Sequence, residues 1–146
     1  MKKVALCLLV IVAAVLTACS STAEPSLVPR TEFTLKATDI AFDNTRLEAQ
    51  AGQPVRLTLQ NEGVLEHDFS IMEMPHTGEV VVDHEVMAGH DMGHMSAEPD
   101  IHVAAAAGSR NMIEFVPSEP GEYEFVCTVA GHKEAGMVGT LVVKAP

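Results

Sequence analysis

Short stretches in which apolar and polar residues alternate recur through most of this chain, and they constrain its fold more than any other feature. A period of two is typical of β-strands with one buried face. Turn-forming sequences such as AGQP, NEG and PSEPG separate the stretches, and no long helical stripe occurs beyond the N-terminal segment. We therefore predict an all-β domain of antiparallel strands in a sandwich or barrel. The alternating segments are 33–37, 55–59, 65–71, 111–116, 123–127 and 137–143.

The N-terminal segment has a different pattern. Two lysines precede an apolar run that ends in LTAC at residues 16–19, a sequence that resembles the bacterial lipobox. At ~1.5 Å per helical residue the run is too short to span a bilayer comfortably. We predict a lipoprotein signal peptide at 1–18, lipid attachment at Cys19, a tether at 19–30 and one domain at 31–146. An ordinary cleaved signal that ends by chance in a cysteine is the alternative.

The mature chain is strongly acidic. The signal peptide would take two of the nine basic residues with it, which leaves seven basic residues against 20 acidic ones and a formal charge of −13. Such a surface repels nucleic acid and acidic membranes and favours a basic protein partner. We therefore expect no nucleic-acid function.

One cysteine indicates a metal site. Cys127 would be the only free thiol of an exported chain, and a cysteine without a disulfide partner in an oxidising compartment indicates reactivity or metal binding. His67, Cys127 and Met137 all share the parity of core residues in their segments. A lone buried histidine or methionine is more often a packing residue. Here, however, the segment 127–137 adds His132 in a C-x4-H-x4-M pattern. These four donors together predict a metal-binding site.

The donor types favour copper over other metals. A trigonal set of two histidines and one cysteine with a long, weak methionine bond is the blue-copper electron-transfer site. Zinc prefers further thiolates or a carboxylate, and calcium and magnesium prefer oxygen. The sequence therefore predicts one copper ion.

The motifs that carry these donors resemble the cupredoxins, the small blue copper proteins. HDF at 67–69 and GEYEFVCTVAGHKEAGMVGTLVV at 121–143 carry the resemblance, which covers most of residues 31–146. The spacing is nearer to the rusticyanin, auracyanin and sulfocyanin types than to plastocyanin. The resemblance implies a Greek-key β-sandwich. It also implies a type 1 copper site with His67, Cys127 and His132 as equatorial ligands and Met137 as the axial ligand.

The resemblance also bears on two further points. Asn61, in QNEG, resembles the asparagine that braces the ligand loops of cupredoxins, although a plain turn residue is an equal alternative. A dinuclear copper centre would need a second cysteine in the loop, and copper oxidases need more than one such domain. Neither feature is present, so we expect no enzyme activity.

Residues 72–100 do not fit a compact cupredoxin. The stretch is rich in histidine and methionine, shows no obvious strands and is predicted to be a long insert loop. Imidazole and thioether donors suit copper, and methionine favours Cu(I). Three interpretations stay open: an acidic loop with accidental donors, an auxiliary copper-capture site, and a partner-docking lid. The candidate auxiliary ligands are His84, His90, Met92, His94 and Met95.

The leading functional hypothesis is a lipid-anchored, monomeric blue copper protein. It would carry single electrons between redox protein partners at the membrane, facing the periplasm or the cell exterior. The alternative is a copper-handling protein, that is a chaperone, store or resistance factor that uses the insert. A third possibility is an accessory subunit of a larger oxidase.

Overall fold

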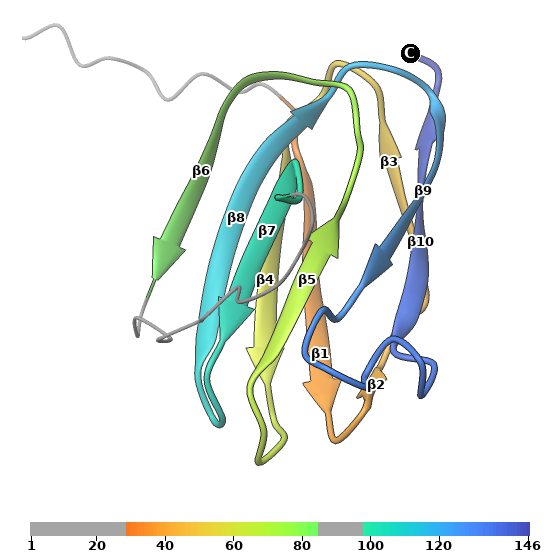
Figure 1. The fold of residues 1–146 in the computed structure, drawn as a ribbon. Coiled ribbons are helices and arrows are strands. Elements are labelled where there is room, and N and C mark those ends of the chain that lie inside the picture. The colour runs from red at the N-terminus through yellow and green to blue at the C-terminus, as the bar shows by residue number, and fades with distance from the viewer. Residues whose placement is uncertain (1–28, 85–97) are drawn as a thin grey trace, which may run out of the picture.

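The computed structural model describes residues 29–84 and 98–146, which form two β-sheets of five strands each (Figure 1). The first sheet has the order β2-β1-β4-β8-β6 and the second has the order β3-β10-β9-β5-β7. The all-β prediction is confirmed. The strands are β1 (Thr31–Thr38), β2 (Ala41–Phe42), β3 (Arg46–Gln50), β4 (Val55–Asn61), β5 (His67–Ile71), β6 (His76–His84), β7 (Ile101–Ala105), β8 (Arg110–Pro117), β9 (Gly121–Val126) and β10 (Val138–Lys144).

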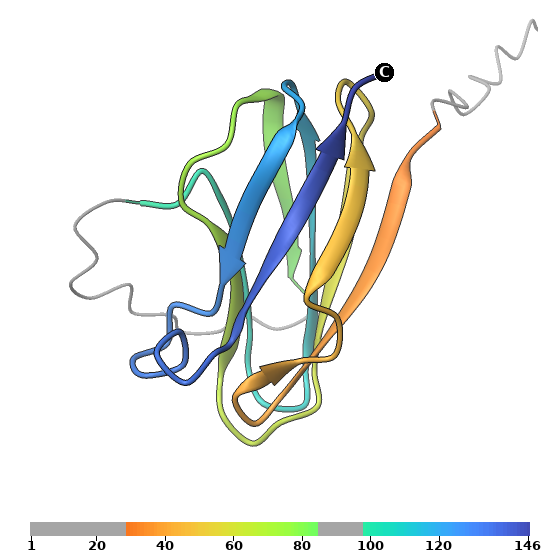
Figure 2. The same ribbon diagram turned by 90° about the vertical axis from the view of Figure 1, so that its right-hand side faces the viewer.

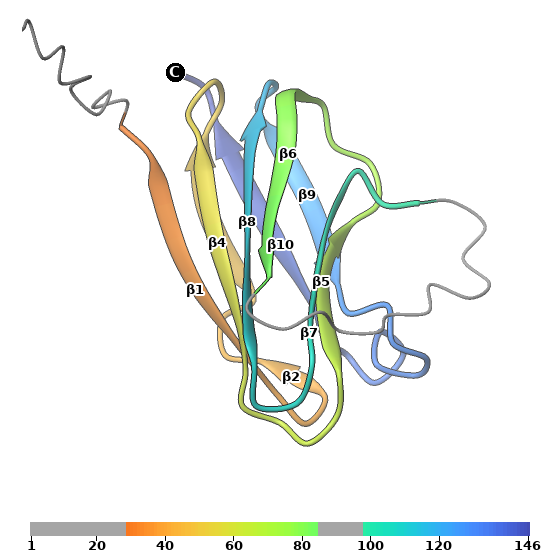
Figure 3. The same cartoon turned by 90° about the vertical axis from the view of Figure 1, so that its left-hand side faces the viewer.

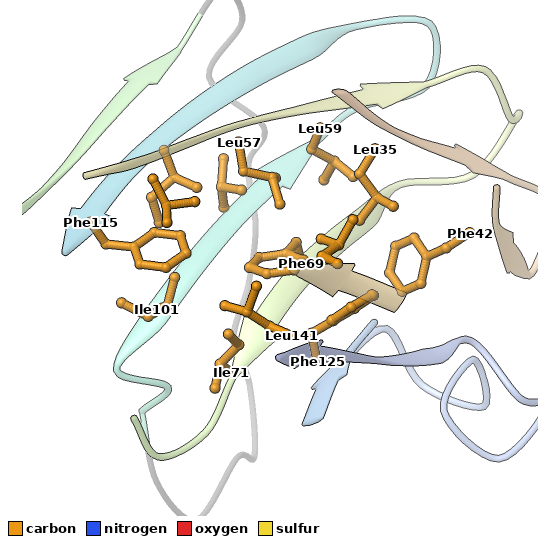
Figure 4. Close-up of a cluster of buried hydrophobic side chains, with 14 of the residues drawn as sticks. Leu35, Phe42, Leu57, Leu59, Phe69, Ile71, Ile101, Phe115, Phe125 and Leu141 are labelled. Atoms are coloured by element: carbon orange, nitrogen blue, oxygen red, sulfur yellow. The ribbon is translucent and has the colours of Figure 1, made fainter. Parts of the chain in front are cut away.

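The sheets pack face to face, and alternate residues of the strands fill the space between them (Figures 2 and 3). β4 and β8 show this most clearly, because every second residue of each is buried. Three phenylalanines join the layers (Figure 4). The ring of Phe125 lies 5.0 Å from that of Phe69 and 5.4 Å, edge-on, from that of Phe42.

A glycine opposite Phe125 makes this packing possible. Gly139 of β10 pairs with Phe125 of β9 in the antiparallel ladder. A Cβ atom on residue 139 would lie 2.2 Å from Cζ of the Phe125 ring. The ring therefore lies over the bare backbone of β10, a close approach that only glycine permits.

Both sheets are mixed, so two of the ladders depart from the antiparallel pairing that the sequence predicts. β1 pairs with β4 in parallel, and β3 pairs with β10 in parallel, whereas the other ladders are antiparallel. β3 belongs to the second sheet, whereas β1 and β2 before it and β4 after it belong to the first. Alternation predicts which face of a strand is buried, but it does not show whether the neighbouring strand runs parallel or antiparallel to it.

The described part of the insert also differs from the prediction. Residues 76–84, expected to lie in a loop, form β6 at the edge of the first sheet, paired with β8. The register shifts between Thr77 and Val81, which breaks the period-two pattern and conceals the strand in the sequence. Residues 85–97 lie outside the described residues.

The predicted signal peptide, Cys19 and most of the tether also lie outside the described residues. Within residues 29–84 and 98–146, no helix is long and apolar enough to cross a membrane.

One end of the sandwich gathers the segments that carry the predicted metal ligands (Figure 1). β5 begins there, β9 ends there, and the connection from β9 to β10 lies below β9 at the same end. The turn between β1 and β2 lies at the same end.

Candidate metal centre

The two predicted histidine ligands and the cysteine meet at this end. His67 is the first residue of β5, Cys127 directly follows β9, and His132 lies in the connection to β10. The Sγ atom of Cys127 is 3.9 Å from Nδ1 of His67 and 3.4 Å from Nδ1 of His132. The three donor atoms lie within 4.8 Å of one another, and the residues are only 0, 0 and 5 % exposed for His67, Cys127 and His132.

These separations suit a single metal ion. A first-row metal with metal–sulfur bonds of about 2.3 Å and metal–nitrogen bonds of about 2.0 Å, at trigonal angles, separates sulfur from nitrogen by about 3.7 Å. The observed values of 3.4 and 3.9 Å lie on either side of that distance. The three donors are therefore already arranged around the volume that one ion would fill.

Burial keeps the Cys127 sulfur protonated when no metal is bound. Burial raises the pKa of the Cys127 thiol to about 11, and the charge of Asp68 adds to the effect. The backbone N–H of Asp68 donates a weak hydrogen bond to Sγ at 3.5 Å. A metal ion that binds at neutral pH must therefore displace the thiol proton.

His67 is held in the neutral form that a metal requires. Burial lowers the pKa of the His67 imidazole, and repulsion from His132 lowers it further. Among the described residues its Nε2 has no hydrogen-bond partner, whereas its Nδ1 faces the Cys127 sulfur at 3.9 Å. Nδ1 is therefore the nitrogen that would bind a metal ion.

Met137, the fourth predicted ligand, is tied by its backbone to two of the other ligands. Its N–H donates to the carbonyl of His132 at 3.0 Å, and its carbonyl accepts from the N–H of Cys127 at 3.1 Å. Its side chain is 1 % exposed. The structure thus places Met137 beside the other ligands, and its axial role stays a prediction.

Two tight turns shape the ligand loop. The N–H of His132 donates to the carbonyl of Val129 at 3.0 Å, and the N–H of Gly136 donates to that of Lys133 at 3.0 Å. Gly131 and Gly136 have φ angles of 84° and 99°, in the left-handed region that favours glycine. The glycines let a short loop return to β10 while it carries His132 to the cysteine.

Asn61 braces the neighbouring turn. It is 2 % exposed, and its Nδ2 donates to the carbonyls of Leu65 at 2.7 Å and Ala105 at 2.9 Å. Its Oδ1 accepts from the N–H of Gly63 at 2.9 Å. Asn61 therefore fixes the chain just before His67, and the bracing interpretation holds over that of a plain turn residue.

The sequence interpretation missed a buried polar group behind the ligands. Asp68 is 0 % exposed, and its carboxylate accepts hydrogen bonds from Thr128 and Ser70. One feature of the sequence could have indicated its role, because Asp68 directly follows the predicted ligand His67. Its alternation placed it on the outer face of β5, where a carboxylate is expected to meet solvent.

Most of the predicted auxiliary copper ligands lie outside the described residues. His90, Met92, His94 and Met95 lie outside the described residues, and only the backbone of His84, at the end of β6, is described. Within residues 29–84 and 98–146, His67, Cys127 and His132 are the one group of three or more histidine, cysteine or carboxylate side chains close enough to share an ion.

Comparisons with known proteins agree with a copper site. A relative named copper-resistant cuproprotein CopI from Rubrivivax gelatinosus is 34 % identical over 117 residues, which span 79 % of this chain and 67 % of the relative. A second protein of that name, from Pseudomonas aeruginosa, is 31 % identical over 131 residues, which span 73 % of this chain and 72 % of the relative.

Solved structures of auracyanins share the fold. The reduced auracyanin of Roseiflexus castenholzii matches with a TM-score of 0.58 at 17 % identity, over 77 % of this chain and 96 % of that one. Auracyanin A of Chloroflexus aurantiacus matches with a TM-score of 0.59 at 21 % identity, over 80 % of this chain and all of that one.

The family comparison covers nearly the whole described domain. The family model of copper binding proteins, plastocyanin/azurin family, matches residues 29–144. That range includes the donor set described above, whose thiolate and imidazoles suit copper. The chain therefore belongs to the plastocyanin/azurin family of copper-binding proteins, the cupredoxins, and its cofactor is copper.

Proposed function

We propose that this chain is a copper-resistance protein that holds one copper ion in a type 1 site. The observation that carries the proposal is its identity of 34 % and 31 % to two proteins named copper-resistant cuproproteins, over about three quarters of this chain. The enclosed donor set of His67, Cys127 and His132 supports it, since sulfur and imidazole donors suit copper.

The residues of the site would do three things. Cys127 would give up its proton and supply a thiolate, and His67 and His132 would supply nitrogen donors. Met137 would supply the weak axial thioether. Bound copper contributes a one-electron change between Cu(II) and Cu(I). Asn61 and the backbone bonds of Met137 to Cys127 and His132 hold the donors in place, so the protein would not need to rearrange during that change.

The proposed location is outside the cytoplasm. A signal peptide at 1–18 and lipid on Cys19 would anchor the domain to a membrane, facing the periplasm or the cell exterior. Copper that enters from the medium would meet the protein there. We propose a monomer without enzyme activity, with protein rather than nucleic-acid partners because the chain is so acidic.

Copper tolerance of a bacterial host tests the resistance proposal. A copper-sensitive strain that expresses the full chain should grow at higher copper concentrations than one that expresses Cys127→Ser, at equal protein abundance. Deletion of residues 84–95 tests whether the insert takes part. If it does, the deletion should lower both the number of copper ions bound per protein and the copper tolerance of the host. Equal growth of wild type and Cys127→Ser would contradict a resistance role for the type 1 site.

Single-electron transfer is the second candidate, and an apolar surface at the copper end favours it. Ile40, Val64 and Leu65 are 42, 78 and 47 % exposed, and the Val64 N–H donates to the carboxylate of Asp39, which joins the two turns. Exposed apolar side chains beside a redox centre suit brief docking of a partner.

An electron carrier should exchange electrons rapidly with a basic redox protein, and Val64→Asp should slow that exchange without changing the absorption spectrum. Unchanged exchange in Val64→Asp would remove the support from this surface.

A further inference from the structure

The outer face of β5 is unusual because it is polar and fully buried. Alternation puts Asp68 and Ser70 on the face opposite to His67, Phe69 and Ile71, yet all five residues are buried. Asp68 and Ser70 are both 0 % exposed. A carboxylate is seldom fully buried in a protein unless specific partners hold it there.

The partners of Asp68 lie on the segment that carries the cysteine ligand. Oδ1 of Asp68 accepts the N–H of Thr128 at 2.9 Å, and Oδ2 accepts the hydroxyl of Thr128 at 2.6 Å. Thr128 directly follows Cys127. The N–H of Asp68 itself donates to the Cys127 sulfur at 3.5 Å. Asp68 is thus bonded on both sides of the Cys127–Thr128 peptide, and it directly follows the ligand His67.

A second arm of the network leads away from the metal centre to β7. The Ser70 hydroxyl lies 3.0 Å from Oδ1 of Asp68 and 2.8 Å from Nδ1 of His102, its cross-strand neighbour. Ser70 has one hydroxyl proton, and the carboxylate can only accept, so that proton goes to Asp68. Nδ1 of His102 must then carry a proton and donate it to Ser70. The chain of donors runs from His102 through Ser70 to Asp68.

The charge of Asp68 lies in the buried interior beside the metal centre. The carboxylate puts a negative potential at the Cys127 sulfur, because its oxygens bond the adjacent Thr128 and the N–H of Asp68 bonds the sulfur itself. The same negative potential favours the more positive oxidation state of an ion bound to that sulfur. Charges in a buried site interact more strongly than in water because the medium between them screens little.

We propose that Asp68 is a positioning residue of the copper centre whose buried carboxylate lowers the reduction potential, and that Ser70 and His102 set the strength of that effect. The proposal rests on the type 1 copper site proposed above. It assigns to Asp68 two effects that can be separated: the bonds to Thr128 hold the cysteine segment, and the charge stabilises Cu(II).

The test compares reduction potentials and absorption spectra of four copper-loaded variants. Asp68→Asn removes the charge but keeps the shape and one acceptor oxygen, and it should raise the Cu(I)/Cu(II) ratio at a fixed solution potential at least tenfold. For a one-electron couple that is a shift of about 59 mV upward. Glu48→Gln is the matched control, because it removes the same charge from an exposed site on β3 and should leave the potential unchanged.

Ser70→Ala gives the opposite sign. The substitution removes the hydroxyl that donates to Asp68, so the negative charge of the carboxylate is less compensated. The Cu(I)/Cu(II) ratio should therefore fall by a factor between two and ten, which is smaller than the change expected for Asp68→Asn. His102→Phe should lower it by less. Opposite shifts in Asp68→Asn and Ser70→Ala separate a charge effect from loosened packing, which would broaden the spectra of both variants in the same way.

The outcomes also separate this inference from the proposed site. If the wild-type protein shows no thiolate-to-copper absorption and no reversible one-electron couple, the type 1 site itself is wrong. If the wild-type protein shows both, and Asp68→Asn has the wild-type potential, then the role of Asp68 is refuted. Shifts of the same sign in Asp68→Asn and Ser70→Ala would also refute it.

Discussion

The raised pKa of Cys127 predicts that copper affinity depends steeply on pH. The pKa of about 11 lies four pH units above neutrality, so the thiolate fraction of the copper-free protein at pH 7 is about 10⁻⁴. At 1.36 kcal/mol per unit, deprotonation of Cys127 at pH 7 costs about 5 kcal/mol of binding free energy, against about 3 kcal/mol for the ordinary pKa of 9.0. Burial thus reduces the affinity by roughly two powers of ten at neutral pH.

The sign and the range of the pH dependence follow from the two ligand types. The thiol pKa is raised, so the thiolate becomes more available, and binding becomes stronger, as the pH rises toward 11. The pKa of His67 is lowered below its ordinary 6.5, so this imidazole is already neutral above pH 7 and adds no dependence there. Between pH 7 and 9 the affinity should therefore rise close to tenfold per pH unit, with one proton released for each copper ion.

Competition titrations with a chelator, corrected for the chelator's own protonation, measure this slope. The proton release can be counted independently with an indicator dye in weak buffer. Cys127→Ser is the control, and its residual copper binding should show no such slope in this range. Affinity of the wild-type protein that does not change between pH 7 and 9 would show that Cys127 is not a ligand, or that its thiol is already ionised in the folded chain.

Three substitutions test single features of the site and the core. Cys127→Ser should abolish the intense colour of the copper protein yet leave a folded chain, destabilised by about 1 kcal/mol, as urea unfolding of the copper-free form can measure. Met137→Leu should retain copper and raise the reduction potential, on the order of 59 mV for a tenfold change in the Cu(I)/Cu(II) ratio. An unchanged potential would exclude Met137 as the axial donor. Gly139→Ala should cost about 1–3 kcal/mol of unfolding free energy, because its Cβ would collide with the Phe125 ring. A wild-type unfolding midpoint would show that the ring can move aside.

The donors could be predicted from the sequence because two independent signals agree. His67, Cys127 and Met137 have ligand chemistry, and each also has the parity of a buried strand residue. Parity is a local property of the chain, so it survives without knowledge of which strands are neighbours. The structure buries all three residues and brings His67 and Cys127 into contact.

The rest depends on interactions that no single segment encodes. The parallel direction of β1 and β4 follows from the path of the chain between the sheets, and the register shift in β6 hides its period. Asp68 has the parity of an exposed residue. It is buried because Thr128, 60 positions away, arrives from the ligand loop and bonds its carboxylate. His102 on β7 bonds the hydroxyl of Ser70, which in turn bonds Asp68.

The distance along the chain between His67 and Cys127 gives the metal a mechanical role. An ion held by both would act as a cross-link between β5 and the C-terminal hairpin of β9 and β10. Because only the folded chain brings these donors together, each tenfold excess of copper over its dissociation constant adds about 1.4 kcal/mol to the stability of the fold. Amide hydrogens of the terminal hairpin should then exchange faster in the copper-free protein than in the loaded one. The copper-free form would therefore unfold more often and be degraded faster in a cell. The lifetime of the protein would increase with the copper supply.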